Sequence, residues 1–144
     1  MKKYLTNNSL ETENLGTAFA KTLKSRDIVL LYGALGAGKT TFVQGIAKGL
    51  GITDRILSPS FVLIRSHNVL FGDIKNLNHI DLYRIEKPSE VKSLGLGEII
   101  GESDSVSIIE WADRISNFKS KKGYKIVFEY LDENKREISI EKLT

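Results

Sequence analysis

The hydrophobic side chains near the start of the chain recur at the spacing of an amphipathic helix. One helical face would carry Leu15, Ala18, Phe19, Thr22 and Leu23. Ser9 stands just before this stretch and is the expected N-cap, and the acidic residues Glu11 and Glu13 suit a first helical turn. The pattern predicts a helix that begins near Ser9 and ends near residues 25–27.

A continuous apolar run, Ile28–Tyr32, follows and leads into the glycine-rich segment Gly33–Thr40. Uninterrupted apolar runs of this length are typical of parallel strands that are buried on both faces. Beyond the glycine-rich segment, Thr41–Leu50 has helical periodicity, and the glycines at 49 and 51 suit its C-terminal end. A buried strand, a loop and a helix are therefore expected in direct succession.

The remainder of the chain is predicted to be mainly strands. Short apolar runs between turn-forming residues predict strands at Phe61–Arg65, Val69–Phe71, Ile80–Tyr83 and Val106–Trp111. Ser89–Leu94 is predicted to be a short helix, and Tyr124–Tyr130 with Glu137–Glu141 a terminal hairpin. We expect one α/β domain over residues 1–144, with a central, mainly parallel sheet, antiparallel additions and the C-terminal hairpin.

The composition is that of an ordinary globular domain and excludes several chemistries. Hydrophobic residues make up 41% and charged residues 27%, and no apolar run approaches the ~20 residues of a membrane helix. The first residues lack the apolar centre of a signal peptide. With no cysteine, the chain has no disulfide, thiolate metal site or cysteine nucleophile. We expect a soluble cytoplasmic protein without a membrane partner.

The net charge of +3 is too small to indicate nucleic-acid binding by itself. The one basic cluster consists of Lys119, Lys121, Lys122 and Lys125. Contact with RNA or an acidic partner is one interpretation of this cluster. A solvated loop that leads into a strand is the favoured one, because runs of charge usually serve solubility.

The segment Gly33–Thr40 matches the phosphate-binding pattern G-x-x-x-x-G-K-[ST]. Its glycines allow backbone N–H groups to converge on an anion, above the positive end of the following helix. Lys39 is predicted to reach the β- and γ-phosphates, and Thr40 to bind Mg2+. The predicted nucleotide-binding residues are Gly33, Gly36, Ala37, Gly38, Lys39, Thr40 and Thr41. A strand before this loop and a helix after it predict a P-loop NTPase-like three-layer sandwich.

A triphosphate site also needs a carboxylate near the end of a neighbouring strand, to hold or orient magnesium. Two acids stand in such places. Glu110 ends the apolar run 106–109, and Asp81 follows His79 and Ile80. Each is alternatively a surface acid. Together with Lys39, they are the candidate catalytic residues.

Three further residues have two open interpretations each. Ser60, after Ser58-Pro59, is either a turn residue or a hydroxyl that approaches the γ-phosphate. His79 is more often a hydrogen-bonded strand residue than a catalytic base. A tryptophan at the position of Trp111 is more often a core or interface residue than one that stacks on the base of a nucleotide.

An ordered series of motifs resembles the TsaE family, bacterial ATPases of tRNA threonylcarbamoyladenosine modification. The resemblance spans roughly residues 9–141. It rests on five segments, which are Gly33–Thr41, Ser58–Phe61, His79–Arg84, Leu94–Glu98 and Ile109–Trp111. The combination is much more specific than any one segment.

This resemblance implies a P-loop fold with ATP and magnesium as ligands. It implies work in a complex with two other proteins of the pathway, the transferase subunit and its paired subunit, with tRNA contacted only indirectly. By the same resemblance, Thr40 and Glu110 are the magnesium ligands, Asp81 is a catalytic acid, and the segment around Ser9 lies near the adenine. Ser60 and Ala34 depart from the family, which usually has threonine and an acidic residue there.

Other nucleotide-dependent functions fit the sequence less well. A small-molecule kinase usually places several arginines around the transferred group, and this chain has six, all isolated. A GTPase would need the motif N-K-x-D, which Asn134–Glu137 approaches but ends in glutamate. A third alternative is a scaffold that binds nucleotide without hydrolysing it. This alternative stays open if Asp81 or Glu110 lies away from the site.

Overall fold

The computed structural model describes residues 1–34, 36–53, 64–70, 72–93, 95–100, 102–112 and 122–143. Several predictions fall outside these ranges. They are the role of Ser60, part of the strand at 61–65, the last residue of the strand at 69–71, the end of the helix at Leu94, and Lys119 and Lys121 of the basic cluster. None of the helices within the described ranges has the length and apolar character that a bilayer crossing requires.

Seven strands form one sheet in the order β1-β7-β6-β2-β5-β4-β3. Pairing is parallel from β6 through β2 and β5 to β4, whereas β1, β7 and β3 join antiparallel. The sheet therefore has the expected parallel centre, antiparallel additions and C-terminal hairpin. The strands are β1 Lys2–Thr6, β2 Ile28–Tyr32, β3 Ile64–Asn68, β4 Asn76–Asp81, β5 Ser105–Glu110, β6 Gly123–Tyr130 and β7 Arg136–Leu143.

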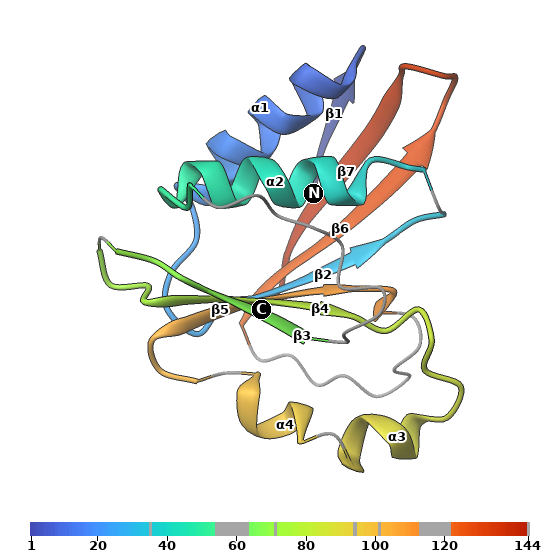
Figure 1. Cartoon of the computed structure of the whole chain (residues 1–144). Coiled ribbons are helices and arrows are strands. Elements are labelled where there is room, and N and C mark those ends of the chain that lie inside the picture. Colours follow the sequence, from blue (N-terminus) through green and yellow to red (C-terminus); the bar gives the residue numbers. More distant parts are fainter. Residues whose placement is uncertain are drawn as a thin grey trace.

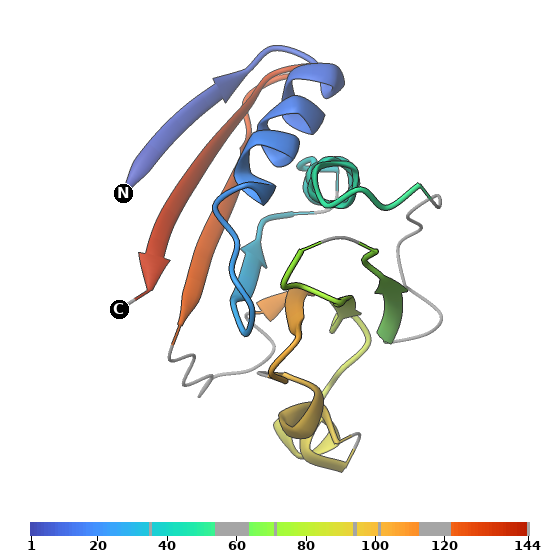
Figure 2. The ribbon, with the colours of Figure 1, turned by 90° about the vertical axis from the view of Figure 1, so that its left-hand side faces the viewer.

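Helices cover both faces of the sheet and make the predicted three layers (Figures 1 and 2). One face carries α1, Ser9–Ala20, and α2, Lys39–Gly49; the other carries the short α3, Pro88–Ser93, and α4, Leu96–Ile99. Side chains of β2 alternate between the two cores. Val29 and Leu31 pack under α1 and α2, and Ile28 and Leu30 pack in the second core with Leu96. This burial on both faces explains the uninterrupted apolar run in the sequence.

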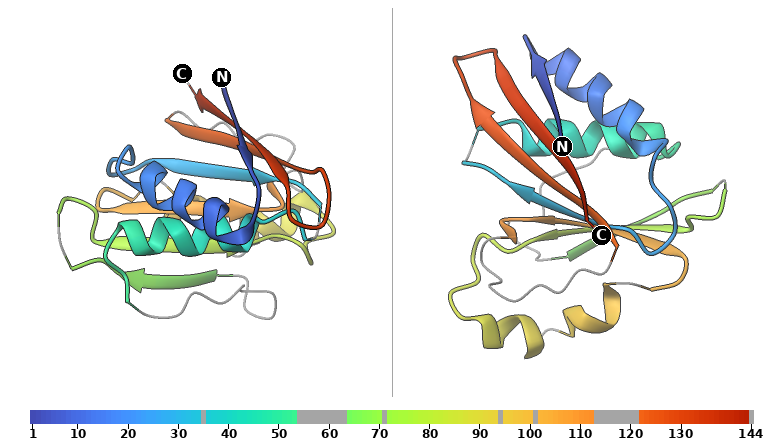
Figure 3. Two further views of the ribbon diagram at one scale, coloured as in Figure 1. Left: turned by 90° about the horizontal axis from the view of Figure 1, so that it is seen from above. Right: turned by 180° about the vertical axis from the view of Figure 1, so that it is seen from behind.

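The helices α1 and α2 approach closely enough that only glycine fits between them (Figure 3). A Cβ atom on Gly16 would collide with the backbone carbonyl of Phe42, and one on Gly45 with that of Glu13. The Thr17 hydroxyl also donates to the carbonyl of Gly45 at 3.1 Å. Because α2 begins in the phosphate-binding segment, this contact also fixes where α1 begins relative to that segment.

We expect Gly45→Ala to lower the free energy of unfolding by about 1–3 kcal/mol, because the new methyl group forces the helices apart. Urea unfolding followed by circular dichroism measures this. Gly97→Ala in α4 is the matched control, since a Cβ atom there meets nothing within 4 Å. Equal unfolding midpoints for Gly45→Ala and the wild type would contradict the close contact.

The beginning of α1 and its end differ from the prediction. The N-cap is Asn8 and not Ser9, because the Asn8 carboxamide oxygen accepts the Glu11 backbone N–H at 2.8 Å. The helix ends at Ala20, before the expected residues 25–27. A turn follows it, in which the Asp27 carboxylate accepts the Lys24 backbone N–H at 2.8 Å.

Strand β4 begins earlier and ends earlier than the predicted strand at 80–83. It contains Asn78 and His79, two buried polar residues whose side chains are each hydrogen-bonded to a neighbouring strand. The Asn78 side-chain oxygen accepts a hydrogen bond from the Ser66 hydroxyl at 2.7 Å. Val69 and Leu70 follow β3 instead of forming a strand, and neither β1 nor α4 was predicted.

Candidate functional site

The segment between β2 and α2 has the backbone conformation that a phosphate-binding loop requires. Gly33, Gly36 and Gly38 have φ angles of +148°, +78° and +98°, which other residues rarely adopt. At Gly33 the neighbouring strand adds a second restriction, because a Cβ atom would lie 2.8 Å from the Phe128 carbonyl oxygen. The loop therefore turns back over the N-terminus of α2, where backbone N–H groups lack helical partners.

Lys39 is the first residue of α2, and its side chain is held inside the loop. It is only 5% exposed, and its ammonium donates to the Gly33 carbonyl at 2.5 Å. The same ammonium lies 3.8 Å from the centroid of the Trp111 ring, within the range of a cation–π contact. A buried positive charge thus stands at the mouth of the loop.

The two predicted acids end neighbouring parallel strands and face each other in register. Asp81 is the last residue of β4 and Glu110 the last of β5, and the two are paired across the strands. They are 5% and 3% exposed. One Asp81 oxygen, Oδ1, accepts the Tyr83 backbone N–H at 2.9 Å, and Glu110 Oε2 bonds His79 Nε2. Both carboxylates are therefore held in fixed directions.

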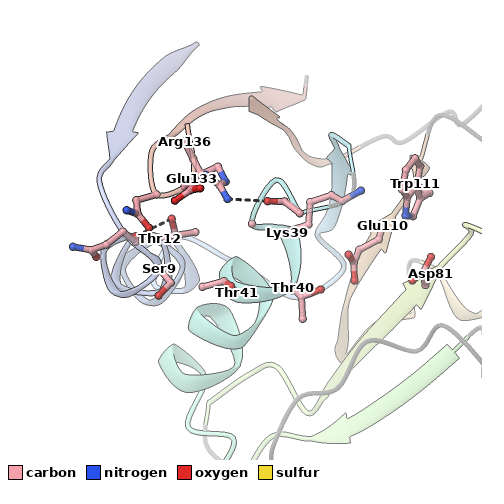
Figure 4. A pocket seen from close by; sticks show the side chains of 14 residues that line it. Ser9, Thr12, Lys39, Thr40, Thr41, Asp81, Glu110, Trp111, Glu133 and Arg136 are labelled. Carbon is pink, nitrogen blue, oxygen red and sulfur yellow. Dashed lines mark hydrogen bonds between the residues drawn. The ribbon is translucent and has the colours of Figure 1, made fainter. Parts of the chain in front are cut away.

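The loop, the acids and two further segments enclose one pocket of about 350 Å³ (Figure 4). Its lining residues are Asn8, Ser9, Thr12, Gly36, Gly38, Lys39, Thr40, Thr41, Asp81, Glu110, Trp111, Glu133, Asn134 and Arg136. All three candidate catalytic residues and both candidate metal ligands are among them. Of the predicted loop residues, Gly33 and Ala37 do not line the pocket; Gly33 accepts from Lys39, and Ala37 is buried.

The far end of the pocket is made by segments from opposite ends of the chain. Figure 4 shows Ser9 and Thr12 at the start of α1, beside Glu133 and Arg136 of the β6–β7 hairpin. An Arg136 Nη2–H donates to the Gly36 carbonyl at 2.9 Å, so the hairpin is tied to the phosphate-binding loop. The sequence does not point to Asn8, Thr12, Glu133 or Arg136 as site residues, and it marks Asn134 only through the near match to N-K-x-D, since only the strand order brings them to this place.

The hairpin turn is shaped by hydrogen bonds of its own. The Asp132 carboxylate accepts the backbone N–H groups of Asn134 and Lys135, each at 2.9 Å. The bond from Asn134, followed by that from Lys135, lowers the pKa of Asp132. An Arg136 Nη1–H also donates to the Asp132 carbonyl at 2.6 Å. The turn therefore presents Glu133 and Asn134 to the pocket in a defined arrangement.

The structure distinguishes the interpretations of Trp111 and His79. Trp111 is partly buried beside the second core, and its ring lies at a tilt to that of Tyr83 and against the Lys39 ammonium, at the phosphate-binding end of the pocket. It does not lie near the hairpin end, where Figure 4 places Arg136 and Thr12. His79 is fully buried and hydrogen-bonded, as expected for a strand histidine.

Comparisons with known proteins find relatives over most of the chain. Residues 6–138 match the sequence profile of the family described as threonylcarbamoyl adenosine biosynthesis protein TsaE. A TsaE from a Nostoc species is 44% identical over 90% of this chain and 78% of its own length. The TsaE of Bacillus subtilis is 38% identical over 95% of this chain and 83% of its own length. The crystal structure of Bacillus subtilis YdiB superposes with a TM-score of 0.81 at 32% identity, covering 99% of this chain and 86% of that one.

Proposed function

The chain belongs to the TsaE family of tRNA threonylcarbamoyladenosine biosynthesis, and on this premise we propose that it is a magnesium-dependent ATPase. In this proposal, it acts in the cytoplasm as a switch within the protein complex that installs threonylcarbamoyladenosine on tRNA. One observation carries the proposal: Lys39, Thr40 and both strand-end acids line the same pocket. A buried ammonium opposite two carboxylates is the arrangement that phosphoryl transfer with a metal ion uses.

The donor set suits a magnesium ion that binds together with a nucleotide. Thr40 and Glu110 would hold the ion, since both line the pocket at its phosphate end. In the described ranges, no group of three or more His, Cys, Asp or Glu side chains is arranged to hold a metal. Magnesium fits such a site, because it keeps several waters and binds phosphates with one or two protein ligands. When bound, it would offset the negative charge of the phosphates.

Asp81 would orient the water that attacks the γ-phosphate. Its hydrogen bond from the Tyr83 backbone fixes the direction of the carboxylate. In the reaction, the water oxygen bonds to the γ-phosphorus, and the bond from that phosphorus to the bridging oxygen of the departing ADP breaks. The proton of the water passes to Asp81 or to a phosphate oxygen. Lys39 and the loop N–H groups would stabilise the developing negative charge.

The nucleoside would occupy the far end of the pocket, between the start of α1 and the hairpin. This follows because the phosphates belong at the glycine loop and the lining continues to Ser9 and Asn134. The hairpin sequence does not make a guanine site of the N-K-x-D type. Its fourth residue, Glu137, lies in β7 outside the pocket lining and pairs with Lys3 at 3.6 Å.

We expect slow hydrolysis by the isolated chain and faster hydrolysis in the complex. The only arginine among the described lining residues is Arg136, which is engaged by the hairpin and Gly36 carbonyls. Among the described lining residues, Lys39 is therefore the only positively charged side chain next to Asp81 and Glu110. An arginine supplied in trans accelerates comparable enzymes by 10³–10⁵-fold.

The test is phosphate release from ATP by the chain alone and with the other two proteins of the pathway. We expect an increase of about tenfold or more in the presence of both partners. The same assay with GTP, and with sugars and shikimate-like acceptors, tests the alternatives. Full activity alone, without acceleration by the partners, would contradict the switch. A phosphorylated acceptor in place of free phosphate would show a kinase.

A further inference from the structure

A buried histidine contacts the proposed magnesium ligand from the neighbouring strand. His79 is 0% exposed and Glu110 is 3% exposed, and His79 Nε2 is hydrogen-bonded to Glu110 Oε2. In the register of β4 and β5, His79 stands opposite Ile108 and Asp81 opposite Glu110. Because side chains alternate along a strand, all four lie on the sheet face that is covered by α2. The imidazole thus sits directly beneath the pocket, behind its carboxylates.

The hydrogen-bonding pattern shows which way the proton of this contact points. In the described part of the chain, His79 Nδ1 is buried and has no hydrogen-bond partner. A proton on Nδ1 would be a buried donor without an acceptor, which is costlier than an unused lone pair. The favoured tautomer therefore carries its proton on Nε2. In that form His79 donates and the Glu110 carboxylate accepts.

The two acids are held by different means. Asp81 has a short side chain, and the backbone N–H of Tyr83 reaches it directly. Glu110 has one more rotatable bond in its side chain, and the only hydrogen bond to its carboxylate within the described residues comes from His79. That bond occupies Oε2 and leaves Oε1 for the pocket that Glu110 lines. A long carboxylate held at one oxygen can present the other in a constant position.

We infer that His79 is a positioning residue that orients the Glu110 carboxylate toward the magnesium ion. The inference rests on the proposed function, because it requires Glu110 to bind the metal. Partners of metal ligands typically change metal affinity or activity 10–100-fold when they are removed. A histidine that only fills the core would instead affect the stability of the fold and leave magnesium dependence unchanged.

The variants His79→Leu and His79→Gln test this assignment. Leucine removes the donor, whereas the glutamine carboxamide nitrogen is as many bonds from Cα as Nε2. Asn78→Leu is the matched control, since Asn78 is buried in the same strand but faces the other way and bonds Ser66. Each protein is titrated by calorimetry with a non-hydrolysable ATP analogue, with and without magnesium, and its urea midpoint is measured.

For His79→Leu, we expect magnesium to enhance analogue binding about 10–100-fold less than in the wild type. Affinity without magnesium should remain unchanged, because Lys39 and the loop are untouched. His79→Gln should recover part of the enhancement, and Asn78→Leu should keep all of it despite lower stability. In hydrolysis, the magnesium concentration at half-maximal rate should rise for His79→Leu and fall back for His79→Gln.

Wild-type magnesium enhancement in a folded His79→Leu protein would overturn the assignment. If that variant does not fold, His79→Gln decides: a reduced magnesium enhancement supports the role, and wild-type enhancement overturns it. The proposed function fails separately, if Glu110→Ala itself leaves the magnesium enhancement unchanged. The two failures are therefore distinguishable in one set of titrations.

Discussion

Replacing Lys39 by alanine is expected to abolish nucleotide binding at physiological concentrations, with a loss of affinity of about 10²–10⁴-fold. Lys39 is the one lysine among the described lining residues of the pocket, and it stands at the loop where the phosphates are expected. Two hydrogen bonds from an ammonium to phosphate oxygens contribute about 1.5–3 kcal/mol each, which gives this range by the usual conversion. The measurement is isothermal titration calorimetry with ATP and ADP, in the presence of magnesium.

Lys48→Ala is the matched control for this variant. Lys48 lies on the same helix, is exposed, and forms an ion pair with Glu13 at 3.8 Å, outside the pocket. It should bind nucleotide as the wild type does. Circular dichroism must show that Lys39→Ala is folded, because the residue is 5% exposed and its side chain packs on Trp111. Binding by the folded variant within about threefold of the wild type would remove Lys39 from the site.

The second large effect is expected for Glu110→Ala. This variant should bind ATP but lose magnesium dependence, and hydrolysis should fall roughly 10²–10³-fold, as when a group that stabilises transition-state charge is removed. Phosphate release measured over a range of magnesium concentrations shows both effects. Because Lys39 and the loop remain, calorimetry without magnesium should give the wild-type affinity.

Two further variants accompany Glu110→Ala. Glu110→Gln keeps the shape of the side chain and removes its charge, so it separates loss of the metal ligand from a cavity beside His79. Glu129→Gln is the control, since this glutamate lies exposed on β6 and outside the pocket lining. An unchanged rate and magnesium optimum in both Glu110 variants would exclude Glu110 from the reaction.

The single tryptophan offers an independent readout of binding. In the structure, the Lys39 ammonium lies over the Trp111 ring. When Lys39 moves to the phosphates, the surroundings of the ring change, and so should its fluorescence. This signal suits the wild type and the Glu110 variants, whereas Lys39→Ala already alters the ring environment and requires calorimetry.

The phosphate end of the site could be predicted from sequence because its parts obey local rules. The strand, loop and helix are contiguous, and the glycines and Lys39 stand at fixed spacing. The acids could be found as well, since the parallel strands β4 and β5 end at the same edge of the sheet. Here the distance along the chain matters little, because strand ends meet wherever the sheet forms.

The remaining parts depend on contacts that leave no local pattern. Strand β1 does not show a regular alternation of apolar and polar residues, because it is an edge strand and four of its five residues are exposed. In β4, the buried polar residues Asn78 and His79 interrupt the apolar pattern, and their partners lie on other strands. The hairpin residues Asn134 and Arg136 reach the pocket only because β6 pairs with β2. None of these partners can be read from neighbouring residues.

The pairing of β1 with β7 has a consequence for the order in which the protein is made. Residues 2–6 leave the ribosome long before residues 136–140, their partners in the sheet. At roughly 5–20 residues per second, β1 waits on the order of ten seconds for its place. The loop at 33–40 is also synthesised early, but β2, which leads into it, pairs with β5 and β6, which are synthesised later. On the proposed function, we therefore expect a nascent chain to carry its phosphate-binding motif without a complete pocket, and to bind nucleotide only after the hairpin has emerged.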